Sequence, residues 1–148
     1  MEIIKVKRIH DAARVPVRAH ATDACFDIFA VIDNDEQEVY ILPGETYRVH
    51  TGIITEIPRG YHCQVYARSG IGITQGLRLA NSVGIIDSDY RGEWIVALHN
   101  DSDYRRVVKT GDRVAQFMLC KNIECKLQIS EDLESTERGA GGLGSTGI

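Results

Sequence analysis

The stretch Gly52-Ile-Ile-Thr-Glu-Ile-Pro-Arg-Gly-Tyr-His-Cys-Gln-Val-Tyr-Ala67 carries the clearest structural signal in this 148-residue chain. Ile53, Thr55 and Ile57 alternate with Gly52, Ile54 and Glu56, and residues 61–67 repeat this period of two, with Tyr, Cys, Val and Ala alternating with His, Gln and Tyr. Because successive side chains of a strand point to opposite faces, this period predicts two half-buried strands. Residues 57–60, Ile-Pro-Arg-Gly, separate the two runs and predict a type I turn with glycine at its last position.

The same alternation of strands and turns continues on both sides of this stretch. Residues 42–45 (Leu-Pro-Gly-Glu) predict a type II turn, and residues 90–93 (Tyr-Arg-Gly-Glu) can turn a hairpin. Residues 94–98 form a continuous apolar run that suits a strand covered on both faces, and residues 114–120 form a second, interrupted only by Gln116. Many short strands joined by turns predict an all-β sandwich, jelly roll or barrel.

Helix signals are weak, and the end of the chain differs from the rest. Residues 71–76 contain too much glycine for a helix, and residues 129–138 suit either a short helical turn or a flexible connector. The length predicts one domain. We expect a β-barrel domain in residues 1–130 and, in residues 131–148, an acidic flexible connector followed by a glycine-rich arm.

Composition excludes several function classes. The net charge of −4 gives no basic footprint for direct nucleic-acid binding. The apolar runs are too short to span a membrane, and the N-terminus lacks the apolar core of a signal peptide. The four cysteines form no metal-binding pair and are interpreted as reduced structural thiols of a cytoplasmic protein. Asn100-Asp101-Ser102 is interpreted as a chance match to a glycosylation acceptor.

The last ten residues before the terminal isoleucine, Arg138 to Gly147, combine a guanidinium, five glycines and two hydroxyls. Glycine lets the backbone approach a ligand closely, and successive N–H groups can form a nest for an anion. Arg138, Ser145 and Thr146 add donors that suit phosphate oxygens. The segment therefore reads either as a phosphate clamp or as a flexible polar tail.

Polar groups also gather at four other places in the chain. Arg68-Ser69-Gly70 follows a predicted strand and makes either a compact anion site or an ordinary turn. Asp87 is a general base or a turn cap, and Tyr90 either stacks on a sugar or covers the core.

Three further side chains, two amides and one carboxylate, are candidate site residues at these places. The amide of Asn81 can read the edge of a polar ring, against which Gly84 permits close packing. Gln116 is either satisfied within the sheet or points into a polar site. Asp27 can turn the chain or hold a metal-bound water. Walker-type, Gly-x-Ser-x-Gly and zinc-ligand patterns do not occur in the sequence.

In order, these segments resemble the five motifs of the homotrimeric deoxyuridine triphosphatases, the dUTP diphosphatases. The five matching segments are Ala24–Ile28, Arg68–Gly70, Asn81–Glu93, Gly111–Gln116 and Arg138–Gly147. The resemblance covers almost the whole chain. It implies a jelly-roll-like β-barrel and a homotrimer whose three active sites lie at subunit junctions. The C-terminal arm would cross to a neighbour and close over the substrate.

The implied reaction converts dUTP and water to dUMP and pyrophosphate, which keeps uracil out of DNA and supplies dUMP for dTMP synthesis. By this resemblance Asp87 activates the water that attacks the α-phosphorus. The resemblance also implies that magnesium would neutralise charge on the triphosphate oxygens and that Asp27 would contact its water shell.

The resemblance also assigns the substrate contacts. The backbone around Gly84, Ile85 and Ile86, aided by Asn81, would read uracil, and Tyr90 would lie under the deoxyribose. The phosphates would be held by a larger set of residues: Arg68, Ser69, Gly70 and Gln116, with Arg138, Gly144, Ser145 and Thr146 at the γ end.

Two positions depart from the family pattern. Leu143 stands where the family usually has phenylalanine, so it would pack on the base without stacking and order it less firmly. Cys25 stands where glycine is common. Two alternatives stay open: a dCTP deaminase of the same fold, for which Glu93 is the candidate glutamate, and a non-catalytic trimer that binds a partner under nucleotide control.

Overall fold

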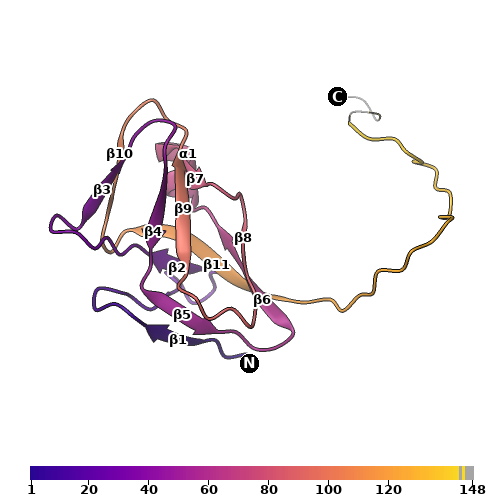
Figure 1. Ribbon diagram of the computed structural model, residues 1–148, viewed down its shortest axis with the longest axis horizontal. Coiled ribbons are helices and arrows are strands. Elements are labelled where there is room, and N and C mark those ends of the chain that lie inside the picture. The colour runs from indigo at the N-terminus through magenta and orange to yellow at the C-terminus, as the bar shows by residue number, and fades with distance from the viewer. Residues whose placement is uncertain (144, 146–148) are drawn as a thin grey trace.

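The computed structural model describes residues 1–143 and 145, and it builds the body from antiparallel strands (Figure 1). The largest sheet has the order β2 (Phe26–Phe29), β11 (Arg113–Lys121), β6 (Tyr61–Tyr66) and β8 (Gly84–Ile86). A second sheet has the order β4 (Thr46–His50), β9 (Ile95–Asn100) and β7 (Leu77–Leu79). Two antiparallel pairs of strands complete the body: β1 (Lys5–Arg8) with β5 (Ile53–Glu56), and β3 (Glu38–Ile41) with β10 (Arg106–Lys109). The strands predicted in residues 53–57, 61–67 and 114–120 are confirmed.

The core lies between the two larger sheets and is centred on Trp94. Its ring meets the edge of Phe117 at 5.0 Å, and Phe117 stacks on Phe26 at 5.3 Å between ring centroids. The indole nitrogen of Trp94 donates to Thr55 Oγ1 at 3.1 Å, which satisfies its one polar atom. Every buried side-chain nitrogen and oxygen within the described residues has a hydrogen-bond partner.

The turns agree with the sequence in one case and differ in another. Gly44 has φ +77° and Glu45 N donates to Leu42 O at 3.0 Å, so the type II turn is confirmed. The second turn lies one residue later than predicted, because Tyr61 N donates to Pro58 O at 3.2 Å. Gly60, with φ +81°, then takes the third position, which makes this turn type II as well.

Two local predictions are wrong. Residues 69–75 form a helix, α1 (Ser69–Gln75), which Gly76 ends at φ +69° by donating its N–H to Ile71 O. Each interior glycine costs only about 1 kcal/mol, so two of them do not forbid two helical turns. The strand after Trp94 is also not covered on both faces, since Ile95 is half exposed; it belongs to an antiparallel sheet with one open face.

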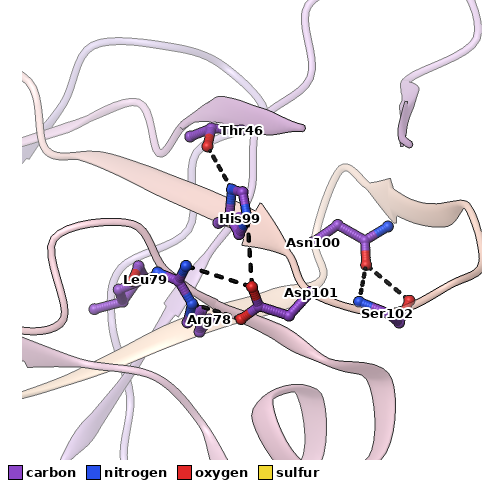
Figure 2. Close-up of polar contacts among 7 residues, drawn as sticks. All are labelled: Thr46, Arg78, Leu79, His99, Asn100, Asp101 and Ser102. Atoms are coloured by element: carbon purple, nitrogen blue, oxygen red, sulfur yellow. Dashed lines mark hydrogen bonds and ion pairs between the residues drawn. The ribbon is translucent and has the colours of Figure 1, made fainter. Parts of the chain in front are cut away.

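Three histidines, His50, His62 and His99, lie in strands, and each makes a hydrogen bond to a polar side chain. Figure 2 shows His99 on β9, where Nδ1 lies 2.8 Å from Thr46 Oγ1 and Nε2 lies 3.3 Å from Asp101. The next residue, Asn100, is fully buried, and its amide donates to Ile41 O and Tyr104 O. The Asn100 amide therefore has a structural role, and the match to a glycosylation acceptor is a coincidence because the buried side chain cannot reach a sugar.

The four cysteines are free thiols, as predicted. Burial raises the pKa of the Cys63 thiol to about 12, which makes it inert. Across the described part of the chain, no helix is long and apolar enough to cross a membrane.

Beyond Lys121 the chain leaves the body as a long extended tail (Figure 1). Neither strand nor helix occurs in residues 122–143 or at 145, and the side chains of residues 122–140 are exposed.

We expect Gly52→Ala to destabilise the protein by about 3 kcal/mol, because φ is +65° and a methyl group would lie 2.7 Å from Ala13 Cβ and 2.9 Å from His10 Cβ. Gly44→Ala is the control: φ is also positive but space is open, so the cost is about 1 kcal/mol. Urea unfolding at equal protein concentration measures both. Equal losses of stability would contradict the close packing at Gly52.

Candidate active site

The first group of predicted site residues surrounds Asp27 on β2. The Asp27 carboxylate is nine-tenths buried and accepts from Arg68 Nε at 2.7 Å and from Arg113 Nη1 at 3.3 Å. Gln116 lies directly across from Asp27 in β11, and its Nε2 donates to Ala67 O at 3.1 Å. Asp27, Arg68 and Gln116 line one cavity of about 290 Å³.

Asp27 fixes the direction of Arg68. Arg68 directly precedes α1, and Ser69 and Gly70 form the first positions of that helix. Because Nε is used by Asp27, the two terminal NH₂ groups of the guanidinium can donate to an anion in the cavity. Sequence reasoning gave no role to Arg113; its register opposite Phe29, near Asp27, is the signal that identifies it.

A protein cage for a metal ion does not occur in the described residues, which contain no cluster of three His, Cys, Asp or Glu side chains. Both Asp27 oxygens already accept hydrogen bonds from arginines. These contacts fit a magnesium ion that keeps its own waters and enters with the phosphates of a ligand. They do not fit an ion held by protein ligands alone.

The second group lies where β8 and β9 diverge into different sheets. Within the described residues β8 pairs only with β6, so its other backbone edge is open. That edge and β9 border a small cavity of about 80 Å³, and the lining includes Asn81, Gly84, Ile85 and Ile86. A methyl group on Gly84 would lie 3.2 Å from Val65 Cβ and 3.5 Å from Asn81 Nδ2. Open N–H and C=O groups here can bind a flat polar ring edgewise.

Asp87 and Tyr90 lie in the loop that follows β8. The turn falls at residues 87–90, where Tyr90 N donates to Asp87 O at 3.2 Å, and not at residues 90–93 as predicted. Tyr90 OH donates to Glu93 O at 3.0 Å, and the ring lies so close to Gly92 that any side chain there would collide with it. Asp87 is exposed and shares a cavity of about 240 Å³ with Tyr90.

Glu93 anchors the end of this loop to the turn between β4 and β5. One carboxylate oxygen accepts from Gly52 N at 2.8 Å and Thr51 N at 3.2 Å, and the other lies 2.8 Å from His50 Nδ1. Burial alone would raise the pKa of Glu93, but His50 and the two backbone N–H groups outweigh it and lower that pKa. Glu93 is thus a fixed, ionised anchor, which is poorly suited to exchanging protons with a substrate.

The third group lies on the extended tail. Arg138 Nε donates to Gly141 O at 2.9 Å, and Leu143 is fully exposed at φ +46°. Ser145 N donates to Gly142 O at 3.0 Å, whereas Gly144 and Thr146 lie outside the described residues. In a single chain, the predicted site residues therefore form three separate groups.

Comparisons with known proteins agree on one family. The family model described as dUTPase matches residues 11–147. The deoxyuridine 5'-triphosphate nucleotidohydrolase of Desulfitobacterium hafniense is 42% identical over 153 residues, which cover 100% of this chain and 99% of that protein. A mutant dUTPase of Staphylococcus bacteriophage 80alpha with dUpNHpp superposes with a TM-score of 0.84 at 28% identity, covering 100% of both chains.

A mutant dUTPase from phage phi11 of S. aureus, whose structure describes the coordination of a structural Mg(II) ion, superposes with a TM-score of 0.76 at 26% identity. The match covers 90% of this chain and 99% of that one. These likenesses confirm the predicted fold class.

We expect Glu93→Gln to lower the free energy of unfolding at pH 7 by about 1–2 kcal/mol, since charged hydrogen bonds are lost. The Glu93 pKa is lowered from 4.5, so its stabilisation is present above that pH and is lost as the pH falls through the folded value. The difference between parent and variant should therefore shrink in acid, as measured by urea unfolding from pH 7 to pH 3. The exposed Glu124→Gln is the control; a Glu93 difference that is constant with pH would contradict the anchor.

Proposed function

This chain belongs to the dUTPase family, and we propose that it hydrolyses dUTP to dUMP and pyrophosphate. Uracil would thereby be kept out of DNA and dUMP supplied for dTMP synthesis. The observation that carries the proposal is the pairing of two groups in one chain: an open strand edge beside an exposed aspartate, and an arginine aimed by a buried carboxylate. The first suits a nucleobase beside a reacting water, and the second suits phosphate.

The open edge of β8 would hold the base. Uracil presents alternating acceptors and a donor along one edge, which the backbone of Ile85 and Ile86 can match and which Asn81 can complete. A cytosine would leave buried groups mismatched, which selects strongly against it. Tyr90, held by its hydroxyl to Glu93 O, would support the deoxyribose and leave no space for a 2′-hydroxyl.

Asp87 would act as the general base. Its carboxylate accepts a proton from a water molecule as the water oxygen attacks the α-phosphorus, and the bond from that phosphorus to the bridging oxygen breaks to release pyrophosphate. The turn at residues 87–90 and the Glu93 anchor hold the loop, so Asp87 needs little reorganisation to reach the water.

Arg68, Ser69, Gly70 and Gln116 would bind the phosphates. Magnesium, when bound, neutralises charge on the triphosphate oxygens, and we retain Asp27 as a contact of its water shell. The bonds from Asp27 to Arg68 and Arg113 give it a second task, which is to orient the phosphate-binding guanidinium.

The active enzyme would be a homotrimer that is completed by exchanged arms formed by residues 131–148. Arg138, Leu143, Gly144, Ser145 and Thr146 would close over the substrate of another subunit. The segment before the arm supports exchange. Ile123, Leu127 and Ile129 are four and two residues apart, so they share one face of the extended chain, and they are almost fully exposed. Such an alternating segment gains stability when a neighbouring copy covers its apolar face.

The two alternatives are less well supported. A dCTP deaminase needs a glutamate that exchanges protons, and Glu93 is instead fixed by three hydrogen-bonding contacts. A non-catalytic nucleotide-controlled trimer would not need an exposed aspartate beside the open strand edge.

We expect Asp87→Asn to reduce pyrophosphate release from dUTP by at least about a thousandfold while dUTP still binds, since shape is kept and the base is lost. The parent should release pyrophosphate from dUTP and no ammonia from dCTP in a nucleotide panel with magnesium. The neighbouring Asp89→Asn is the control and should retain activity. Normal turnover by Asp87→Asn, or ammonia from dCTP, would overturn the assignment.

A further inference from the structure

A cavity of about 530 Å³ in the body is lined by five cationic side chains. It lies over α1, β7, β9, β10 and the start of β11. The cations are Arg68, Arg105, Arg106, Lys109 and Arg113, and the apolar floor includes Leu77, Leu98 and Val108. The proposed reaction uses only Arg68 directly, so most of this basic pocket has no role in it.

The cations at the outer rim are held in place by the loop after β9. Asn100 fixes that loop, since its amide donates to Tyr104 O at 2.8 Å and its Oδ1 accepts from Ser102 N at 3.0 Å; Figure 2 shows the contact with Ser102. Ser102 Oγ in turn accepts from Arg106 Nε at 3.0 Å. Arg105 stacks on Tyr40 at 4.8 Å from the ring centroid. Lys109 already pairs with Glu38 at 2.7 Å, and Asp112 also lines the pocket, whereas Arg105 and Arg106 form no ion pair among the described residues. These two guanidiniums are thus held in place and available, which lowers the entropic cost of binding an anionic partner.

The chain contains a segment of matching chemistry immediately before its arm. Residues 131–137 carry Glu131, Asp132, Glu134 and Glu137 and no cation, and their side chains are exposed. Leu133, in the middle of the segment, is 89% exposed and can pack on the apolar floor. Charge and apolar content of the segment therefore both complement the pocket.

Chain length places this segment beside the pocket. Arg138 directly follows it, and the proposed clamp brings Arg138 to phosphates bound by Arg68, which also lines the pocket. Seven residues reach at most about 25 Å, so residues 131–137 lie within that distance of Arg68 whenever the arm is closed, and the pocket is within their reach.

The direction of β11 favours a connector from another copy. Arg113 at the pocket is the first residue of β11 and Lys121 is the last, so the chain's own tail begins about 27 Å away and heads outward (Figure 1). To fill its own pocket, the tail would have to turn back along the whole strand.

We propose that the acidic connector of a second copy of this chain, residues 131–137, docks in the basic pocket lined by Arg105, Arg106 and Lys109. The inference rests on the proposed exchange of arms. Docking tethers the arm beside the phosphate site, which raises its effective concentration there and favours closure over bound substrate.

Charge reversal tests the docking. The variant Arg105→Glu/Arg106→Glu and the variant Glu131→Lys/Asp132→Lys/Glu134→Lys should each raise the KM for dUTP about tenfold with kcat nearly unchanged, because closure weakens and chemistry does not. Combining both sets should restore KM to within about threefold of the parent. Lys7→Glu, an exposed reversal on β1, should leave KM unchanged. Unchanged KM in the two variants, or additive losses in the combination, would overturn the proposal.

A cross-link gives a second readout that needs no activity. Chains with Arg105→Cys and differently tagged chains with Glu134→Cys are co-expressed and oxidised with a dUTP analogue present. We expect a disulfide that joins the two differently tagged chains and that does not form when either variant is expressed alone. A chain that carries both changes is oxidised in parallel. If a disulfide forms only within that chain, or if no disulfide forms in either experiment, docking of a second copy is contradicted. Absence of pyrophosphate release by the parent would instead refute the proposed function and leave the cross-link result interpretable.

Discussion

The loop between β8 and β9 is the constraint on which the site depends, because it joins strands of two different sheets. Trp94 enters the core at its end, and Glu93 fixes it to the backbone of Thr51 and Gly52. With those ends fixed, β8 and β9 diverge, and one backbone edge of β8 stays unpaired within the described residues. If β8 instead paired with β9 as in an ordinary hairpin, this edge of β8 would be occupied and could not bind the proposed base.

A second constraint is electrostatic. The proposed substrate is a triphosphate and the chain has a net charge of −4, so positive charge has to be gathered locally. Asp27 does this at a buried position, where its carboxylate holds Arg68 and Arg113 in fixed directions. Four acidic residues of the chain lie in the connector, where the proposed docking would pair them with Arg105, Arg106 and Lys109.

Sequence patterns predicted β5, β6, β9 and β11, because alternating or continuous apolar runs reflect which side chains face the core. They missed α1, since glycine content was weighed without the stop that Gly76 provides. They placed the turn after β8 at residues 90–93 because Gly92 indicated a turn, whereas the structure shows that Gly92 leaves space for the Tyr90 ring. Motif order indicated the candidate site residues, but within one chain they lie in three separate groups. The hydrogen-bond partners of Asp27 and Glu93 depend on strand register between distant segments, and the spacing of residues in the sequence carries no information about that register.

Mixing two inactive proteins tests most directly that each site is built from several chains. One is Asp87→Asn, and the other is truncated after Glu137; both are denatured together and refolded at equal amounts. If the arm serves a neighbour, mixed trimers contain sites with an intact Asp87 from one chain and an intact arm from another, and pyrophosphate release from dUTP returns. If release stays at the level of the separate variants although mixed trimers form, each chain uses its own arm and the composite site is wrong.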